Sequence, residues 1–429
     1  MPWLFCFKLP ELCSIFLDAR LFTDRFACQG TELRLVCLRG MTWQHRRAID
    51  PLIETLPGFR AHHPGIDVEW MSRPLAGFEF QSVEELSRSY DLIILDHPFI
   101  GDAARKGYLM CLDSLLAGRD TDYIGPSLST YRYEGAIYAA PVDAACQVAA
   151  FRPDLMVQIG AEIPKTWTEV LSLGDAVARK GLKLAIALGG VHSLMTFFTL
   201  MAGLGRPCAQ SPEEPFCDRA AAHEALALLR GLLQFCRPDT LDWNSIRLHE
   251  VMVAEDLFVY CPAVYCYATY AEPDQRRPLR FADLPGPASQ SPTGSTIGGT
   301  GLAISASSNS PEAALAYAAF AAGVKAQREF ARHHGQPARI EIWQDAEIDH
   351  TFGGCFAATH ATLEGSWTRP RYPGYLGFQE RGGVLVEHHL RGELSEGQLL
   401  TKLQQAFVLS AAGIRNSGPK DASLEDHRY

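Results

Sequence analysis

The sequence predicts an α/β protein built from two lobes, and three features of the chain support this prediction. Strand-like and helix-like segments alternate between residues 32 and 98, and a second alternating region begins near residue 164. Extended segments that carry proline and aromatic residues lie between these regions and after the second one. Such alternation favours parallel strands joined by crossover helices. The 429 residues, of which 47% are hydrophobic, suffice for at least two packed domains.

The charge pattern excludes two classes of partner. The formal net charge is -10, and the 39 lysines and arginines are scattered along the chain. Nucleic acids and anionic membranes are bound by clustered positive charge, so we expect neither as a partner. No apolar run reaches the roughly 18 to 20 residues that a membrane span needs.

The first 31 residues are predicted to be an extension outside the fold. Lys8, Glu11, Asp18 and Arg20 interrupt their apolar stretches, and no basic residue comes before them, which is atypical of a secretory signal. As the sequence stands we expect a cytoplasmic protein, or a periplasmic or extracellular one if a signal sequence has been lost from the start of the chain.

The twelve cysteines are dispersed, without a CxxC pair or a histidine at metal-ligand spacing. We therefore expect mostly free, buried thiols, no metal site and no cofactor. Cys208 with Cys217, and Cys261 with Cys266, are the pairs that lie close together in the sequence.

Residues 32–98 are expected to form three strands and two helices. The strands are predicted at residues 32–40, 66–70 and 91–98, and the helices at residues 45–63 and 82–89. The third strand has the continuous apolar run of a strand covered on both faces. Functional groups are expected just past the ends of parallel strands, at residues 41–45 and 96–98.

Two extended stretches predict passages between the lobes. The first surrounds Pro141 within residues 131–156, and the return crossing occupies residues 256–271. Between them we expect a helix at 167–180, a strand at 182–190, and helices near 194–204 and 220–235. A glycine-rich turn at 294–301 then opens a strand, and Pro311 follows polar N-cap residues at the start of an alanine-rich helix. Helices are expected to about residue 410, before a frayed tail at 411–429.

Several segments, in this order, resemble the extracellular solute-binding proteins of ABC importers, in particular the sugar-binding branch that includes maltose-binding protein. They are the strand DLIILDHP, the crossing YEGAIYAAPVDAACQVAAFRPDLM with its G-x-x-Y-x-x-P pattern, the turn PKTWTEVL, the segment DWNSIRLHEVMVAEDLFVYCPAVY, and the stretch from the glycine turn through SSNSPEAALAYAAFAAGVKAQREF to GQPAR. The resemblance covers most of residues 32–410. Phe151-Arg152-Pro153 departs from the family's usual Tyr-Asn-Lys.

The resemblance implies a two-lobed periplasmic-binding-protein fold of type II, with the ligand in a cleft that closes by hinge bending. It places lobe 1 at residues 32–143 plus about 264–310, and lobe 2 at residues 144–263 plus about 311–410. It implies transport of a small polar ligand, most simply a carbohydrate or a polyol, to an ABC permease.

Sugars need aromatic faces and fixed polar groups, and these requirements select the candidate site. The ligand-binding candidates are Trp43, His45, Asp96, His97, Asp143, Trp243, Tyr265, Tyr267, Gly299, Thr300, Arg369 and Tyr372. Strand alternation places Tyr265 and Tyr267 on one face, as a sugar platform or a packed layer. Glycines in the turn offer backbone N–H groups or only a tight turn, and Arg369 offers a bidentate clamp for a carboxylate or a stack on tyrosine.

A second hypothesis is a cytoplasmic enzyme or sensor on the same fold. Its acid-base candidates are His45, Asp96, His97 and Asp143. Catalytic motifs such as G-x-S-x-G, a Walker-type loop and H-E-x-x-H are missing, so the non-catalytic binding protein is favoured.

Overall fold

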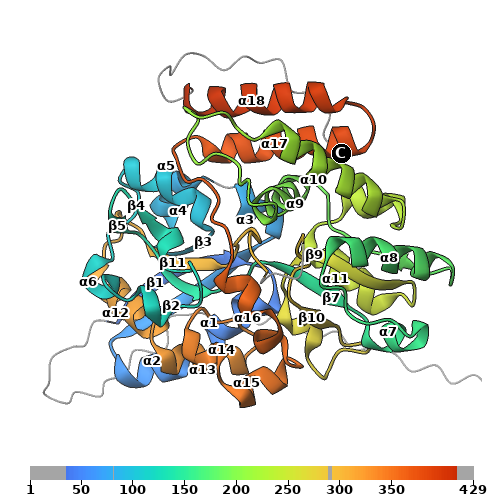
Figure 1. Ribbon diagram of the computed structural model, residues 1–429. Helices are drawn as coiled ribbons and strands as arrows, with labels where there is room; N and C mark the ends of the chain where they lie inside the picture. Colours follow the sequence, from blue (N-terminus) through green and yellow to red (C-terminus); the bar gives the residue numbers. More distant parts are fainter. Residues whose placement is uncertain (1–34, 81, 288–291, 413–429) are drawn as a thin grey trace, which may run out of the picture. The chain divides into compact units, whose positions relative to one another are not determined.

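The computed structural model describes residues 35–80, 82–287 and 292–412. The predicted extension at residues 1–31 and the tail beyond residue 412 lie outside the described residues. The chain divides into residues 1–35 and a unit that begins at Val36. This second unit contains two separate main sheets, as the two-lobe prediction requires (Figure 1).

The first sheet has five strands in the order β2-β1-β3-β11-β6. Its strands are β1 (Val36–Trp43), β2 (Ile66–Arg73), β3 (Leu92–Leu95), β6 (Ala140–Asp143) and β11 (Thr300–Ile304). β1 pairs in parallel with both β2 and β3, which confirms the predicted crossover arrangement, whereas β11 is antiparallel to β3 and β6. The strand predicted to end at Gly40 continues to Trp43.

The second sheet has four strands in the order β10-β7-β9-β8. They are β7 (Gln147–Phe151), β8 (Lys183–Leu184), β9 (Phe258–Tyr265) and β10 (Arg280–Ala282), and a separate ribbon is formed by β4 (Arg132–Tyr133) and β5 (Ala136–Ile137). The two predicted crossings are therefore β6 leading to β7 and the long strand β9. β9 ends at Tyr265, so Tyr267 belongs to the following turn and not to the same strand face.

Helices connect and cover both sheets (Figure 1). The α-helices are α1 (Arg46–Glu54), α2 (Leu56–His62), α3 (Leu75–Phe80), α4 (Val83–Ser89), α5 (Ile100–Arg105), α6 (Asp113–Leu116), α7 (Pro153–Ile159), α8 (Trp167–Ala178), α9 (Val191–Gly203), α10 (Arg219–Leu233), α11 (Ser245–Ala254), α12 (Pro311–Ala321), α13 (Val324–Arg332), α14 (Ile340–Trp343), α15 (Ala346–Thr351), α16 (Cys355–Glu364), α17 (Tyr375–Leu390) and α18 (Glu396–Ala412). The 3-10 helices are η1 (His97–Phe99), η2 (Asp120–Asp122), η3 (Ser129–Tyr131), η4 (Pro238–Asp242) and η5 (Ala268–Ala271).

Local sequence explains where two key helices begin. α8 starts with a capping box in which the Thr166 hydroxyl accepts from the Glu169 N–H, while the Glu169 carboxylate accepts from the Thr166 N–H. α12 starts with Pro311 in its first turn, as the sequence predicts. The polar side chain of Ser310 makes no capping hydrogen bond to that helix, which differs from the expectation.

Some helices after β11 pack on the first sheet and not on the second. The sequence predicts that residues from about 311 to 410 belong to lobe 2. In the structure, α12 packs on β11 and β6 of the first sheet, and α13 packs on α1. Farther along, α16 packs on β10, and α17 packs on α9 and α18. The chain thus stays on the first sheet after β11, because α12 buries Ala314, Tyr317 and Ala318 there.

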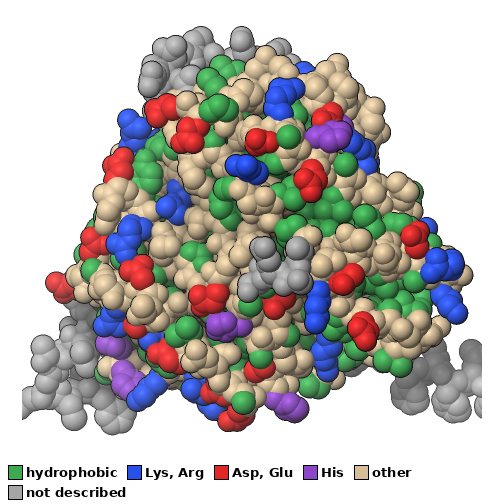
Figure 2. All heavy atoms as spheres, viewed as in Figure 1, with side chains coloured by type: hydrophobic (Ala, Val, Ile, Leu, Met, Phe, Trp, Pro, Cys, Tyr) green, Lys and Arg blue, Asp and Glu red, His purple; other side chains and the backbone are tan. Residues whose placement is uncertain are grey.

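The surface carries both signs of charge. On the face that Figure 2 shows, lysine and arginine side chains alternate with aspartate and glutamate side chains and do not gather into a basic patch. Among the described residues no helix is both long enough and apolar enough to cross a bilayer.

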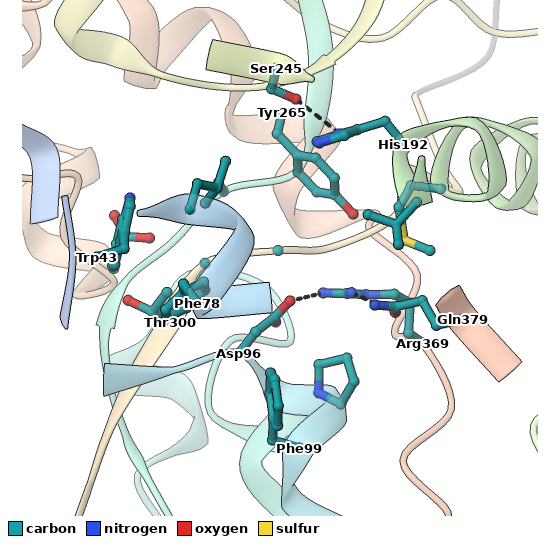
Figure 3. Close-up of a pocket in the computed structure, with 18 of the residues that line it drawn as sticks. Trp43, Phe78, Asp96, Phe99, His192, Ser245, Tyr265, Thr300, Arg369 and Gln379 are labelled. Carbon is teal, nitrogen blue, oxygen red and sulfur yellow. Dashed lines mark hydrogen bonds and ion pairs between the residues drawn. The ribbon is translucent and has the colours of Figure 1, made fainter. Parts of the chain in front are cut away.

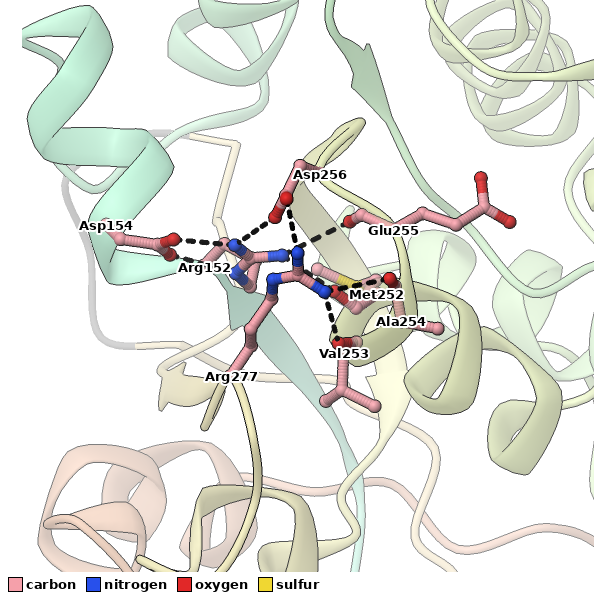
Figure 4. Close-up of polar contacts among 8 residues, drawn as sticks. All are labelled: Arg152, Asp154, Met252, Val253, Ala254, Glu255, Asp256 and Arg277. Atoms are coloured by element: carbon pink, nitrogen blue, oxygen red, sulfur yellow. Dashed lines mark hydrogen bonds and ion pairs between the residues drawn. The ribbon is translucent and has the colours of Figure 1, made fainter.

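Arg152, within the Phe151-Arg152-Pro153 segment where this sequence differs from the usual Tyr-Asn-Lys, has a structural role (Figure 4). Arg152 follows β7 and is only 1% exposed. Its Nε and Nη2 donate to the two carboxylate oxygens of Asp154 at 2.8 and 2.6 Å, and Nη2 also donates to Asp256 at 2.8 Å. Its Nη1 donates to the carbonyls of Met252 and Glu255, both at 3.1 Å. This guanidinium therefore ties β7 to the junction between α11 and β9.

We expect Arg152→Met to lower the free energy of unfolding by about 3 kcal/mol, because two backbone carbonyls lose their charged donor. Equilibrium urea unfolding measures the change. The matched control is Arg247→Met, whose guanidinium is 57% exposed and lies 3.8 Å from Glu250, and which should change stability by about 0.5 kcal/mol or less. Equal losses in the two variants would show that Arg152 does not organise this junction.

Candidate functional site

A cavity of about 100 Å³ lies where the edges of the two sheets face each other (Figure 3). From the first sheet, the wall takes side chains at the ends of β1, β3 and β6 and at the start of β11. Opposite them lie side chains from the end of β9 and from the N-terminal parts of α9, α11 and α17. The lining residues are Trp43, Arg47, Leu75, Phe78, Asp96, Pro98, Phe99, Asp143, Ala145, Val191, His192, Met195, Ser245, Tyr265, Tyr267, Gly298, Gly299, Thr300, Arg369, Leu376 and Gln379.

Arg47 and Asp143 form a buried bidentate ion pair at one end of the cavity. Arg47 Nε lies 2.7 Å from one carboxylate oxygen and Nη2 lies 2.6 Å from the other. The Arg47 Nη1 donates to the Cys266 carbonyl, and the guanidinium lies 4.6 Å from the centre of the Tyr267 ring. Burial alone would lower the pKa of Arg47, but the Asp143 carboxylate holds it above its usual value. Burial raises the pKa of Asp143, and the charge of Arg47 opposes this shift. The two short hydrogen bonds between them have the geometry of a charged pair, and each member already has its partner.

A second ion pair joins the end of β3 to the segment before α17. Arg369 Nη2 donates to Asp96 Oδ2 at 2.5 Å, and Nη1 donates to Gln379 Oε1 at 2.9 Å. Burial would raise the pKa of Asp96, but the charge of Arg369 outweighs it and lowers the pKa to about 2. His97 is fully buried, with Nδ1 2.9 Å from the Asp96 carboxylate. Asp96 is thus ionised and held from two sides.

Aromatic rings form much of the remaining wall. Trp43 and Phe78 pack together with their ring centres 5.1 Å apart, Phe99 lies below them, and Tyr265 faces them across the cavity (Figure 3). Such flat apolar faces suit the C–H surfaces of a small organic ligand.

Several buried polar atoms at the cavity have no hydrogen-bond partner among the described residues. They include the Trp43 indole N–H, the Thr300 hydroxyl and the Arg369 Nε–H. Each of these side chains is at most 5% exposed. Buried polar groups are normally paired, so these three unsatisfied atoms beside the cavity are exceptions.

His192 and Ser245 form the polar side opposite Asp96. His192 Nδ1 and the Ser245 hydroxyl lie 3.3 Å apart, and both come from the first turns of their helices. Burial lowers the pKa of His192 to about 4, and the charge of Arg369 adds to this shift. The imidazole is therefore neutral at pH 7.

The glycine turn shapes the cavity through close packing. A side chain at Gly298 would lie 2.8 Å from the Tyr265 ring, and one at Gly299 would lie 2.5 Å from the Asp143 carbonyl. The Gly298 N–H already donates to the Ala145 carbonyl at 2.7 Å. Gly299 has a φ of 84°, which favours glycine. The turn thus brings Thr300 to the cavity wall.

Of the predicted site residues, Trp43, Asp96, Asp143, Tyr265, Tyr267, Gly299, Thr300 and Arg369 line this one cavity. Their roles toward a ligand stay predictions. Four other candidates, His45, His97, Trp243 and Tyr372, do not line this cavity.

His45 caps a helix, and His97 lies beneath the cavity. The His45 ring accepts from the Arg47 N–H at 3.1 Å and packs edge-on against Tyr267. Burial lowers the pKa of His45 to about 3, with a contribution from the charge of Arg47. Burial likewise lowers the pKa of His97, to about 4. Both rings are therefore neutral at pH 7. Neither lines the cavity, because a position near the end of a strand does not by itself make a side chain face the cavity.

Trp243 and Tyr372 are packing residues. Trp243 is held between Phe258, at a ring-centre distance of 5.4 Å, and the guanidinium of Arg237 at 5.1 Å. The Tyr372 hydroxyl lies 2.8 Å from the hydroxyl of Ser410 on α18. Each aromatic ring therefore contacts its own lobe and not the cavity.

Sequence reasoning missed several residues of the wall. Arg47, Phe78, Phe99, His192, Ser245 and Gln379 line the cavity and were not candidates. Two signals were present in the sequence. Arg47 lies in the first turn of the helix predicted at residues 45–63, and Ser245 follows the candidate Trp243 by two residues. Gln379 gave no local signal, because its place depends on how α17 packs.

A model of the family described as bacterial extracellular solute-binding protein matches residues 82–339, more than half of the chain. The chain belongs to this family. The fold and the order of segments predicted from the sequence agree with this membership.

Solved structures share the fold over nearly their whole length. The GacH receptor of Streptomyces glaucescens, whose unliganded and acarbose-bound forms are known, is 17% identical, and the match covers 88% of this chain and 98% of that chain with a TM-score of 0.75. Maltose-bound MalE3 of T. maritima is 17% identical with coverages of 87% and 99% and a TM-score of 0.74. A mannitol-bound ABC transporter protein of Agrobacterium vitis is 18% identical with coverages of 90% and 100% and a TM-score of 0.68. These similarities establish a two-lobed α/β solute-binding fold.

The neutral, buried His192 makes stability depend on pH. Its pKa of about 4 lies below the 6.5 of an unfolded chain, so the unfolded state binds more protons and stability falls as pH falls from 6.5 through 4. Between pH 7 and pH 5 this group removes about 2 kcal/mol. We expect His192→Gln to reduce the loss of unfolding free energy between pH 7 and pH 5 by about that amount, as measured by urea unfolding at the two pH values. An unaltered slope in His192→Gln would contradict a buried neutral imidazole.

Proposed function

We propose that this protein binds a small, uncharged polyhydroxy ligand, a carbohydrate or a polyol, between its two lobes and delivers it to an ABC importer. The observation that carries this proposal is that the ionisable groups of the cavity neutralise one another, while buried hydroxyl and N–H groups beside aromatic rings lack partners.

Charge balance argues against an anionic ligand. Arg47 is engaged by Asp143 and Arg369 by Asp96, each through hydrogen bonds of 2.5 to 2.7 Å. A phosphate or carboxylate would have to displace an aspartate from its arginine, and separating the buried Arg47–Asp143 pair is costly. A neutral ligand leaves both pairs in place.

The free polar atoms match hydroxyl groups. The Thr300 hydroxyl both donates and accepts, the Trp43 indole donates, and the Arg369 Nε donates. Hydroxyl groups of a sugar or polyol serve as partners for all three. Trp43 and Tyr265 supply aromatic faces on opposite sides of the cavity.

Cavity size favours a small ligand. The volume of about 100 Å³ is below the roughly 300 to 1000 Å³ of drug-sized pockets. Related structures carry maltose, tagatose, mannitol and ribitol, and one carries glycerophosphocholine. The neutral cavity of this chain supports the first group as models for its ligand, with monosaccharides and polyols the better match for size.

The acid-base groups of the enzyme hypothesis are all engaged in the fold. Asp96 and Asp143 each hold an arginine, His45 caps α1, and His97 is buried behind Asp96. This arrangement supports a binding role. We further infer, from the family, an ABC permease as partner and a location outside the cytoplasm.

A thermal-shift screen of the purified chain tests the proposal. The panel contains neutral sugars and polyols, sugar phosphates, amino acids, organic acids and acyl thioesters. A ligand at 100 times its Kd stabilises the folded state by about 2.7 kcal/mol, which raises Tm. We expect hits among neutral polyhydroxy compounds, recovered unchanged when checked by mass spectrometry. Hits confined to anions, or chemical conversion of a hit, would contradict the proposal.

We expect Thr300→Val to weaken binding of the best neutral hit by about 1 to 2 kcal/mol, because the variant loses a hydroxyl that faces the ligand. Stability should be unchanged or slightly higher, since a buried unpaired hydroxyl is removed. The matched control is Thr42→Val. Thr42 also has a buried hydroxyl without a partner among the described residues but does not line the cavity. Calorimetric titration that finds the same affinity in both variants would reject the role of Thr300.

A further inference from the structure

A pair of cysteines far apart in the sequence meets beside the cavity. Cys266 Sγ and Cys355 Sγ lie 3.4 Å apart, across 89 residues of chain, and both are thiols in the structure. Both side chains are buried, with residue exposures of 2% and 1%. The sequence draws attention only to the neighbouring pairs Cys208 with Cys217 and Cys261 with Cys266, and this contact is different from both.

The backbone on both sides of this contact is held in place. The Cys266 N–H donates to the Cys146 carbonyl at 3.1 Å, and the Cys266 carbonyl accepts from Arg47 at 2.5 Å. Cys355 is the first residue of α16, and its N–H donates to the Phe352 carbonyl. The Asp349 carboxylate accepts from the next two N–H groups of that helix. The two sulfur atoms therefore face each other from fixed positions and not from mobile loops.

We propose that Cys266 and Cys355 are a redox site that closes to a disulfide when the protein folds in an oxidising environment. A small disulfide RSSR is the oxidant. Each thiol gives up one proton and one electron, the bond between Cys266 Sγ and Cys355 Sγ forms, the S–S bond of the oxidant breaks, and two RSH leave. The sulfur atoms must approach from 3.4 Å to about 2.05 Å for the bond to form.

Burial determines when this bond forms. Burial raises the pKa of the Cys355 thiol well above its usual value, so little thiolate is present in the folded state. Reaction is therefore expected mainly while the chain folds or opens. Once formed, the bond is shielded from reductants by the same burial.

The position of the bond gives it a consequence for the site. Cys266 lies between Tyr265 and Tyr267, which both line the cavity, and its carbonyl is bound to Arg47. α16 packs on β10 of the second sheet. The disulfide would join the turn after β9 to α16, and would stabilise the segment that carries Tyr265 at the end of β9 and Tyr267 in the turn.

Peptide mapping tests the proposal without any ligand, so its result is independent of the proposed function. The full chain is incubated with reduced and oxidised glutathione, once in native buffer and once during refolding from urea, and free thiols are then alkylated under denaturing conditions. We expect a linked peptide pair that contains Cys266 and Cys355, two hydrogens lighter than the separate peptides and cleaved by dithiothreitol. Alkylated or glutathionylated Cys266 and Cys355 in both samples, or a bond from Cys266 to Cys146, would overturn the proposal.

Thermal unfolding of variants provides the second readout. The oxidised chain should melt roughly 5 °C above the reduced chain, because the bond closes a long loop. Cys355→Ala should abolish this difference. Cys261→Ala, a matched control at a buried cysteine of β9, should retain both the linked peptide and the difference. A difference that persists in Cys355→Ala would show that another pair of cysteines is responsible.

Discussion

Two arginine–aspartate pairs are the constraint on which the cavity depends: Arg47 with Asp143 is buried, and Arg369 with Asp96 is partly buried, with the Asp96 carboxylate 21% exposed. Arg47 with Asp143 ties the first turn of α1 to the end of β6, where the chain leaves the first sheet. Arg369 with Asp96 ties the end of β3 to the segment before α17, and Gln379 extends that link to α17 itself. The strand ends are thus fixed by charge-assisted hydrogen bonds, which are strong and directional where water is excluded.

The same pairs determine what the cavity can bind. Each carries one positive and one negative charge, and the imidazole of His192 is neutral because burial lowers its pKa to about 4. The charged groups consequently cancel, and the polar atoms that remain at the wall are hydroxyl and N–H groups such as those of Thr300 and Trp43. Aromatic faces beside uncharged donors and acceptors select neutral polyhydroxy compounds over anions.

Much of the fold and part of the site follow from the sequence alone. Asp96 could be placed because functional groups collect at the ends of parallel strands, and Asp143 because a carboxylate in an apolar crossing needs a partner. Contacts across long sequence distances could not be predicted. The pairing of Arg369 with Asp96 and the meeting of Cys266 with Cys355 depend on how α16 and α17 pack. Trp243 and Tyr372 do not line the cavity, since an aromatic ring near a crossing packs in a core as readily as at a site.

The most direct test is a crystal structure of the complex with the neutral sugar or polyol that binds best. We expect the ligand between Trp43 and Tyr265, with its hydroxyl groups within hydrogen-bond distance of the Thr300 hydroxyl and the Trp43 indole, and with both arginine–aspartate pairs intact. A ligand bound elsewhere, or an arginine released from its aspartate to hold the ligand, would contradict it.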